Sequence, residues 1–272
     1  MTIRNCSIWM IALAISISLF SCHPNNIENE DDNWGKFFTE NHVKGTFALY
    51  DNGHGTFSIS NLSWYKDSAF LPASTFKIVN SLIGIETGII NNENMIIKWD
   101  GIKRRPEWDK DLTMKEAFAV SAVPYYQEVA RRIGQDTMQH WLDTLHYGTT
   151  KITGKIDSFW LDNSLKITPD EQLGLAMALY FDKLPFQKRT MNIVKSVMLR
   201  ESNTAYNLSY KTGLGYAPNG NAIGWVLGWI EENKHPYFFV LNIEGDHNMD
   251  PDIRIKMLKK ILNTKSLLGG KQ

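Results

Sequence analysis

Residues 72–88 have the sequence PASTFKIVNSLIGIETG, whose apolar residues recur near the 3.6-residue period of an α-helix. The pattern predicts a helix that begins at Ser74 and ends at Gly88. Positions i and i+3 share one helix face, so the Lys77 amine can reach the Ser74 hydroxyl. A free serine is a weak nucleophile that needs an adjacent base. Ser74 and Lys77 are therefore a candidate nucleophile and base.

The Ser-x-x-Lys spacing is weak by itself, because about one such match is expected by chance in a chain of this length. Ser63-Trp64-Tyr65-Lys66 has the same spacing, but no helix start follows it, and we interpret it as a polar segment between a strand and a loop. Two later segments single out Ser74, namely Ser121-Ala122-Val123 and Lys211-Thr212-Gly213. The second lies at the end of a strand-like run, where a lysine can hold a substrate carboxylate and a glycine lets substrate approach the backbone. Each segment alone has an ordinary explanation, a serine at a helix end or a solvated lysine in a turn.

The surrounding pattern predicts strands near both ends of the chain and helices between them. Strands are expected at 45–50, 56–60, 206–212, 222–231 and 237–243, and helices at 114–122, 126–133, 136–145, from Thr168 and at 252–262. This order predicts an α+β fold, with an antiparallel sheet flanked by helices and an inserted all-helical region.

The composition excludes several classes of protein. Lys plus Arg and Asp plus Glu both number 29, so there is no basic excess for binding nucleic acid. A chain that is 43% hydrophobic and 21% charged is globular rather than mostly disordered. Nine tryptophans favour a large core or an aromatic-lined cleft. No metal is expected, because no zinc-site spacing occurs among His54, His140, His146, His235 and His247.

The first 22 residues differ from the rest of the chain. An uncharged, mainly apolar run from Ser7 to Phe20 follows Arg4, and it is too short to span a bilayer comfortably. Such a run is typical of a secretory signal peptide. The end of the run, Leu19-Phe20-Ser21-Cys22, resembles the lipobox of bacterial lipoproteins, in which the signal is cut before a cysteine that becomes lipidated.

We therefore expect a lipoprotein signal peptide at 1–21, a lipidated Cys22, a flexible tether at 22–33 and a single catalytic domain at 34–266. The alternative is an ordinary signal peptide that happens to contain Cys22. The implied location is that of an exported bacterial lipoprotein, anchored to a membrane by its lipid and facing the periplasm. No feature of the sequence specifies an oligomeric state.

With the three motifs in place, the chain resembles the serine penicillin-recognising enzymes, and among them the class D (oxacillinase-type) β-lactamases. The likeness covers most of the mature chain and lies in residues 72–78, 99–101, 121–126, 147–148, 159–161, 211–213, 224–225, 228–229 and Arg254. Class A β-lactamases have Ser-Asp-Asn where this chain has Ser121-Ala122-Val123. The family usually has Tyr-Gly-Asn where this chain has Tyr147-Gly148-Thr149, but both Asn and Thr cap turns.

The resemblance implies a β-lactamase/transpeptidase-like fold and a role for each matching residue. Ser74 would be acylated by a β-lactam, and Lys77 would carry a carbamate formed with carbon dioxide and serve as general base, with no other cofactor. The residues expected around the carbamate are Phe76, Val123 and Trp160. Apolar surroundings lower the pKa of a lysine, and only the neutral amine attacks carbon dioxide.

The remaining roles concern proton transfer and substrate binding. Ser121 would relay protons to the departing nitrogen, with Lys211 in support. Thr212 and Arg254 would hold the substrate carboxylate, and the N–H groups of Ser74 and Leu214 would form the oxyanion hole. Gly213 and Trp108 complete the expected substrate site.

Three functions remain open at this level. The first is a hydrolase of β-lactam antibiotics. The second is a sensor or penicillin-binding protein that stays acylated, and the third is a cell-wall D-Ala-D-Ala peptidase.

Overall fold

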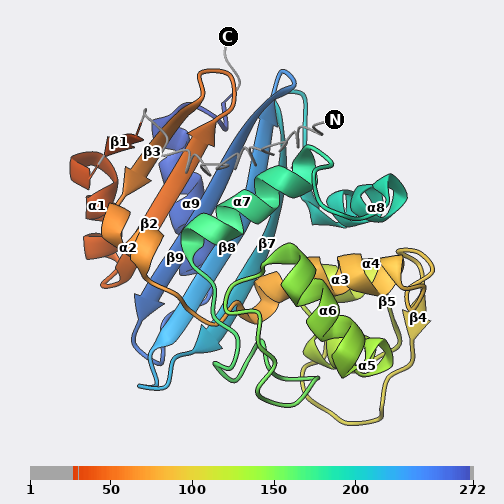
Figure 1. Ribbon diagram of the computed structural model, residues 1–272. Coiled ribbons are helices and arrows are strands. Elements are labelled where there is room, and N and C mark those ends of the chain that lie inside the picture. The colour runs from red at the N-terminus through yellow and green to blue at the C-terminus, as the bar shows by residue number, and fades with distance from the viewer. Residues whose placement is uncertain (1–26, 30, 270–272) are drawn as a thin grey trace, which may run out of the picture.

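A seven-stranded sheet lies at the centre of the computed structural model, which describes residues 27–29 and 31–269 (Figure 1). Its strands are β1 (Ile27–Asn29), β2 (Lys44–Asp51), β3 (Thr56–Ser60), β6 (Leu199–Ser202), β7 (Tyr206–Tyr216), β8 (Ala222–Glu232) and β9 (His235–Gly245). Their order is β1-β3-β2-β9-β8-β7-β6, and every neighbouring pair is antiparallel except β1 and β3. β4 (Ile96–Ile97) and β5 (Leu112–Thr113) pair separately.

Helices cover both faces of the central sheet (Figure 1). The helical segments are α1 (Asp31–Glu40), α2 (Leu62–Asp67), the 3-10 turn η1 (Ala73–Phe76), α3 (Lys77–Glu86), α4 (Met114–Ala119), α5 (Val123–Ile133), α6 (Gln135–Leu145), α7 (Pro169–Tyr180), α8 (Lys188–Met198) and α9 (Ile253–Thr264). α1 and α9 share a hydrophobic cluster with one sheet face, and α7 packs on the other. The helices α3 to α6 gather beside the sheet, which confirms the predicted α+β architecture with an inserted helical region.

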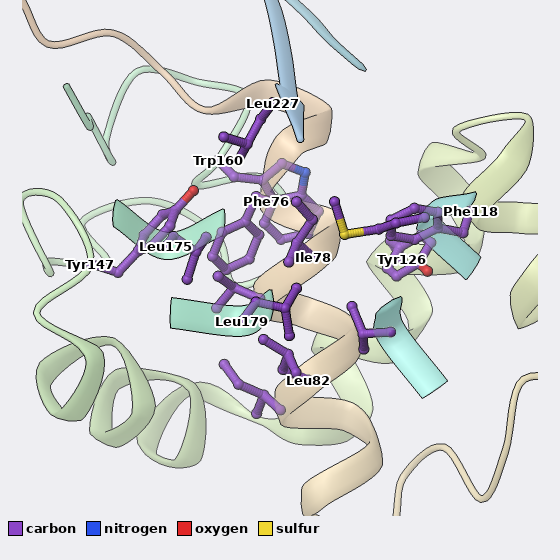
Figure 2. Close-up of a cluster of buried hydrophobic side chains, with 14 of the residues drawn as sticks. Phe76, Ile78, Leu82, Phe118, Tyr126, Tyr147, Trp160, Leu175, Leu179 and Leu227 are labelled. Carbon is purple, nitrogen blue, oxygen red and sulfur yellow. The ribbon is translucent and has the colours of Figure 1, made fainter. Parts of the chain in front are cut away.

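α3 lies inside the larger hydrophobic core (Figure 2). All residues from Lys77 to Ile85 are buried, so the helix presents no polar face to water. Side chains from α4, α5, α7 and β8 surround it, among them Phe118, Tyr126, Leu175, Leu179 and Leu227. A lysine in the first turn of such a helix is consequently separated from solvent.

Short-range signals explain several element boundaries. Thr168 caps α7 by accepting a hydrogen bond from Glu171 N, and the Glu171 carboxylate accepts one from Thr168 N in return. The β8–β9 hairpin turns at Asn233 and Lys234, whose φ angles of 51° and 66° suit a two-residue turn. Thr149 Oγ1 accepts a hydrogen bond from Lys166 N at 3.2 Å, so threonine serves as a turn cap at the position usually held by asparagine.

The structure corrects the interpretation of two motif segments. Ser63 and Lys66 lie in α2 rather than in a strand-to-loop segment, because Asn61 caps that helix by accepting a hydrogen bond from Trp64 N. β7 continues to Tyr216, so Lys211-Thr212-Gly213 lies in the middle of a strand and not at its end. The helices α1, α2 and α8 were not predicted.

The predicted signal peptide and Cys22 lie outside the described residues. The predicted tether at 22–33 extends too far, because residues 27–29 form β1 and residues 31–33 begin α1. Over the described part of the chain, no helix combines the length and the apolar character needed to cross a membrane.

Candidate active site

The candidate nucleophile Ser74 lies in the tight turn that leads into α3. Ala73, the residue before it, has a left-handed φ of 48°, and its N–H donates to Trp160 O at 3.0 Å. Lys77 Nζ lies 2.8 Å from Ser74 Oγ, as the one-turn spacing predicts. The side chain of Ser74 is buried, with 8% exposed. This turn therefore holds the hydroxyl and the amine in hydrogen-bonding contact, largely away from water.

Burial lowers the pKa of Lys77 to about 7, and Lys77 is only 1% exposed. The cause of this lowered pKa is desolvation, since burial disfavours the charged ammonium. The ring of Tyr126 lies beside the amine, with its centroid 5.4 Å from Nζ. Near neutral pH a large fraction of Lys77 is consequently an uncharged amine with a free lone pair.

A second serine and lysine meet next to this pair, although they lie 90 positions apart in the sequence. Lys211 Nζ donates to Ser121 Oγ and to Thr212 O, both at 3.0 Å. Ser121 has a left-handed φ of 58° in the connection between α4 and α5, a strained conformation of the kind found at functional sites. Burial lowers the pKa of Lys211 far below its usual value, and the positive charges of Lys77, Arg200 and Arg254 lower it further.

β7 lies close against the turn that carries Ser74. A Cβ on Gly213 would lie 3.1 Å from Pro72 O, and one on Gly215 would lie 2.7 Å from Leu71 Cδ1. Trp225 Nε1 donates to Leu71 O at 2.9 Å and fixes the chain before the turn. Gly213 thus serves the approach of β7 to the turn, in addition to the access for substrate inferred from sequence.

Arg254 reaches the same strand from α9. Its guanidinium donates to Gly213 O and, at 2.7 Å through Nε, to Pro251 O. Burial lowers the pKa of Arg254 to about 10. The structure therefore brings Arg254 to the strand segment of Thr212, Gly213 and Leu214, where the sequence predicts a substrate carboxylate.

Trp160 is fully buried and stacks on Phe76, with ring centroids 5.3 Å apart (Figure 2). Among the residues that the structure describes, its buried Nε1 finds no acceptor, and Trp160 O holds the turn at Ala73. Val123 is the half-buried first residue of α5, two positions after Ser121. The predicted apolar residues thus lie on the elements that enclose Lys77 and Ser121.

Trp108 lies against the turn that carries Ser121. Its Nε1 donates to Val120 O at 3.0 Å, directly before Ser121. Its side chain lines a cavity of about 380 Å³ together with Leu112 and Tyr125, and neither Ser74 nor Lys211 lines this cavity. Trp108 therefore supports the Ser121 turn, and its place in the substrate site stays a prediction.

Sequence reasoning missed two residues next to the site. Gln172 Nε2 donates to Thr75 Oγ1, which in turn donates to Pro72 O, both at 2.7 Å, so that a buried chain of hydrogen bonds fixes the turn. Arg200 donates to the carbonyls of Phe118 and Tyr210, next to Ser121 and Lys211. No local pattern marked either residue, since their partners lie far away in the sequence. In the described ranges no cluster of three potential metal ligands comes together.

Comparisons with known proteins agree with this geometry. Residues 37–263 match the family described as the penicillin binding protein transpeptidase domain. The chain is 36% identical over 244 residues to beta-lactamase OXA-11 of Pseudomonas aeruginosa, covering 89% of this chain and 91% of that one. The crystal structure of the class D beta-lactamase YbXI from Nostoc aligns with a TM-score of 0.81 at 37% identity, over 88% of this chain and 99% of that one. The C-terminal domain of the Bacillus licheniformis BlaR penicillin-receptor aligns with a TM-score of 0.84 at 30% identity, over 89% and 97%.

Proposed function

The chain belongs to the penicillin-binding transpeptidase family and, within it, to the class D serine β-lactamases, and we propose that it hydrolyses β-lactams with Ser74 as nucleophile and carboxylated Lys77 as general base. The observation that carries this proposal is a buried lysine with a pKa of about 7, whose Nζ lies 2.8 Å from the serine hydroxyl. A pKa near the working pH leaves much of Lys77 as the neutral amine, which is the form that reacts with carbon dioxide to give the carbamate base.

Acylation begins when Ser74 Oγ attacks the ring carbonyl and passes its proton to the Lys77 side chain. The bond between the carbonyl carbon and the ring nitrogen then breaks, and Ser121 gives its proton to that nitrogen while it takes one from Lys211. The N–H groups of Ser74 and Leu214 stabilise the oxyanion. Before deacylation the proton that Lys77 took from Ser74 passes to Lys211, which restores both the base and the ammonium. Lys77 then takes a proton from the water that attacks the ester carbonyl. The bond between that carbon and Ser74 Oγ breaks, and Lys77 gives the proton to Oγ, which releases the product and restores Ser74.

The carbamate on Lys77 would supply a carboxylate base. Its formation requires the neutral amine, which burial favours. Trp160 Nε1 supports the assignment, because a buried N–H without an acceptor is costly unless an acceptor arrives. The indole stacks on Phe76, in the turn that carries both Ser74 and Lys77.

The substrate carboxylate would bind where Arg254 meets β7. The guanidinium is already held by Gly213 O and Pro251 O, so little side-chain entropy remains to be lost on binding. Thr212 would add a hydroxyl donor on the same strand. An arriving carboxylate would also raise the pKa of Arg254 back toward its usual value, because an opposite charge offsets the burial of the guanidinium.

Excess benzylpenicillin tests the proposal, with product formation and the mass of the protein followed together. We expect continuous product formation and no lasting adduct. One equivalent of product with a persistent adduct on Ser74 would contradict hydrolysis.

The carbamate is tested by bicarbonate. After dilution into buffer depleted of carbon dioxide, activity should fall, and added bicarbonate should restore it. A turnover rate that does not respond to bicarbonate would contradict the carboxylation of Lys77 and leave the serine assignment intact.

The likeness to the BlaR penicillin-receptor favours a second candidate function, a sensor that stays acylated. The same experiment separates the two, because a sensor gives the persistent adduct. We rank hydrolysis first, since Trp160 and the lowered pKa of Lys77 fit a carbamate that would also drive deacylation.

We further propose that the chain is exported and anchored to a membrane through a lipidated Cys22. Support comes from the sequence alone, from the apolar run Ser7–Phe20 and the Leu19-Phe20-Ser21-Cys22 segment. Incorporation of labelled palmitate into the full chain, and its loss in Cys22→Ala, would be expected. Equal labelling of both proteins would contradict the anchor.

A further inference from the structure

Arg200 occupies a bulge in the edge strand β6. Leu199 pairs with Ser209 of β7 while Glu201 pairs with Leu208, so Arg200 is the one extra residue between them. A β-bulge redirects the side chain of its extra residue, and bulges are frequent next to active sites. Here the bulge turns a half-buried guanidinium toward α4 and β7.

One guanidinium holds the main chain behind both members of the Ser121–Lys211 pair. Arg200 Nη2 donates at 3.3 Å to Phe118 O, the carbonyl that also accepts the N–H of Ser121. Arg200 Nε donates at 3.3 Å to Tyr210 O, directly before Lys211. The guanidinium carbon also lies 5.6 Å from the centroid of the Phe118 ring, and Lys211 Nζ lies at the same distance from that centroid. The two cations therefore share one aromatic ring as neighbour.

Arg200 is a positive charge without a carboxylate partner within the part of the chain that the structure describes. Burial lowers its pKa, and only Tyr210 and Tyr126 act in the opposite direction. The surface arginines Arg131 and Arg132, in contrast, both pair with Glu128. The positive charge of Arg200 therefore lowers the pKa of the neighbouring Lys211 without being offset by a paired carboxylate in the described residues.

We propose that Arg200 is a positioning residue of the hydrolytic reaction, which holds Ser121 and Lys211 at hydrogen-bonding distance and makes the Lys211 ammonium readier to give its proton to Ser121. The inference rests on the proposed function, in which this pair protonates the departing nitrogen. In that step an N–H bond forms on the substrate from the proton of Ser121, and Ser121 takes a proton from Lys211, which becomes a neutral amine. The groups that face Lys211 are Lys77 on α3, Ser121, Arg200 on β6 and Arg254 on α9. The positive charges of Arg200 and Arg254 disfavour the Lys211 ammonium, whereas a carbamate on Lys77 would favour it.

The test compares three variants over pH 6–10, with rates of acylation and of turnover measured for a chromogenic cephalosporin. Arg200→Met removes the positive charge and both guanidinium hydrogen bonds, so the pKa of Lys211 should rise. The basic limb of the acylation rate should then move up by about one pH unit, and the rate at pH 7 should fall about tenfold with little change in KM. Arg200→Lys keeps the charge, so its basic limb should stay in place while its rate falls. Arg189→Met is the matched control, since exposed Arg189 also donates to a main-chain carbonyl, that of Asn91, and it should behave as wild type.

An unchanged basic limb in Arg200→Met, at any rate of acylation, would overturn the inference and leave Arg200 a structural residue. If this variant does not fold, Arg200→Gln retains amide donors without the charge and should show the same shift. A wild-type protein that acylates but does not turn over would overturn the proposed hydrolysis instead. The basic limb of the pH dependence of acylation would still test the role of Arg200, because the departing nitrogen is protonated during acylation.

Discussion

Two Ser-x-x-Lys segments lie eleven residues apart in this chain, both in helical turns, and only one forms a candidate site. Lys77 Nζ lies 2.8 Å from Ser74 Oγ, and Lys77 is 1% exposed. Lys66 instead pairs with Asp170 at 2.7 Å, with 36% of its side chain exposed, and Ser63 Oγ donates to Asp67. Identical spacing therefore produces a serine–lysine contact in one helix and two unrelated surface contacts in the other.

The difference shows that burial, rather than spacing, makes a lysine a base. The partly exposed ammonium of Lys66 stays in contact with water and pairs with a carboxylate at the surface. In the first turn of α3 burial removes the amine from water, so the pKa of Lys77 falls to about 7. The apolar residues that surround α3 are therefore as important to the chemistry as the motif is.

The largest effect is expected when each of the two lysines is removed in turn, which tests whether burial distinguishes Lys77 from Lys66. Lys77→Ala should lower turnover of benzylpenicillin by about 10³-fold or more, because the base is lost, while the protein remains folded by circular dichroism. Lys66→Ala should change turnover less than twofold. Comparable losses in the two variants would mean that burial does not distinguish the lysines.

The pH dependence of stability tests the burial of Lys77 directly. With a folded-state pKa near 7 and an unfolded value near 10.4, the unfolded chain binds more protons between these limits, so stability rises with pH there. Below pH 7 the penalty for burying the ammonium is fully present. In buffer free of carbon dioxide, the advantage of Lys77→Met over wild type should shrink by about 2–3 kcal/mol from pH 7 to pH 9. Urea unfolding measures it, and a difference independent of pH would contradict the lowered pKa.

A tryptophan accompanies each Ser-x-x-Lys segment, so the two can be compared by substitution. Trp160 stacks on Phe76 of the segment with Ser74, and Trp64 lies within the segment with Ser63. Trp160→Phe removes the unpartnered N–H while keeping a ring on Phe76, and it should lower turnover about tenfold through loss of one hydrogen bond to a charged group. Excess bicarbonate should recover part of that loss. Trp64→Phe breaks the 2.7 Å bond to Asn242 Oδ1 and should affect thermal stability alone. A bicarbonate response in Trp64→Phe, or none in Trp160→Phe, would contradict the assignment of the carbamate partner.

The smallest effect is expected at the surface pair. Asp170→Asn removes the partner of Lys66, and because both side chains are over a third exposed the loss in unfolding free energy should stay below about 1 kcal/mol. Turnover should be unchanged. A larger loss, measured by urea unfolding, would mean that this pair contributes more than ordinary surface ion pairs do.

Much of the fold could be predicted because its signals are local. The strands β2, β3, β8 and β9 and the helices α6, α7 and α9 were predicted within a few residues, from alternation, periodicity and the cap at Thr168. The missed helices α1 and α2 follow acidic or Asn-containing starts that also suit loops. The extra length of β7 was missed because its glycines suggest turns in sequence, whereas in the structure Gly213 packs closely against Pro72 and Gly215 against Leu71 within the strand.

The sequence by itself determined that the Ser74 and Lys77 side chains lie within reach of each other, because residues one helical turn apart share one face of the helix. Only the tertiary structure decided that this lysine is buried and Lys66 is not, that Ser121 meets Lys211, and that a bulge directs Arg200 behind them. The physical reason is range. Hydrogen bonds within a turn depend on a few neighbouring residues, whereas desolvation and charge depend on every segment that packs around a group.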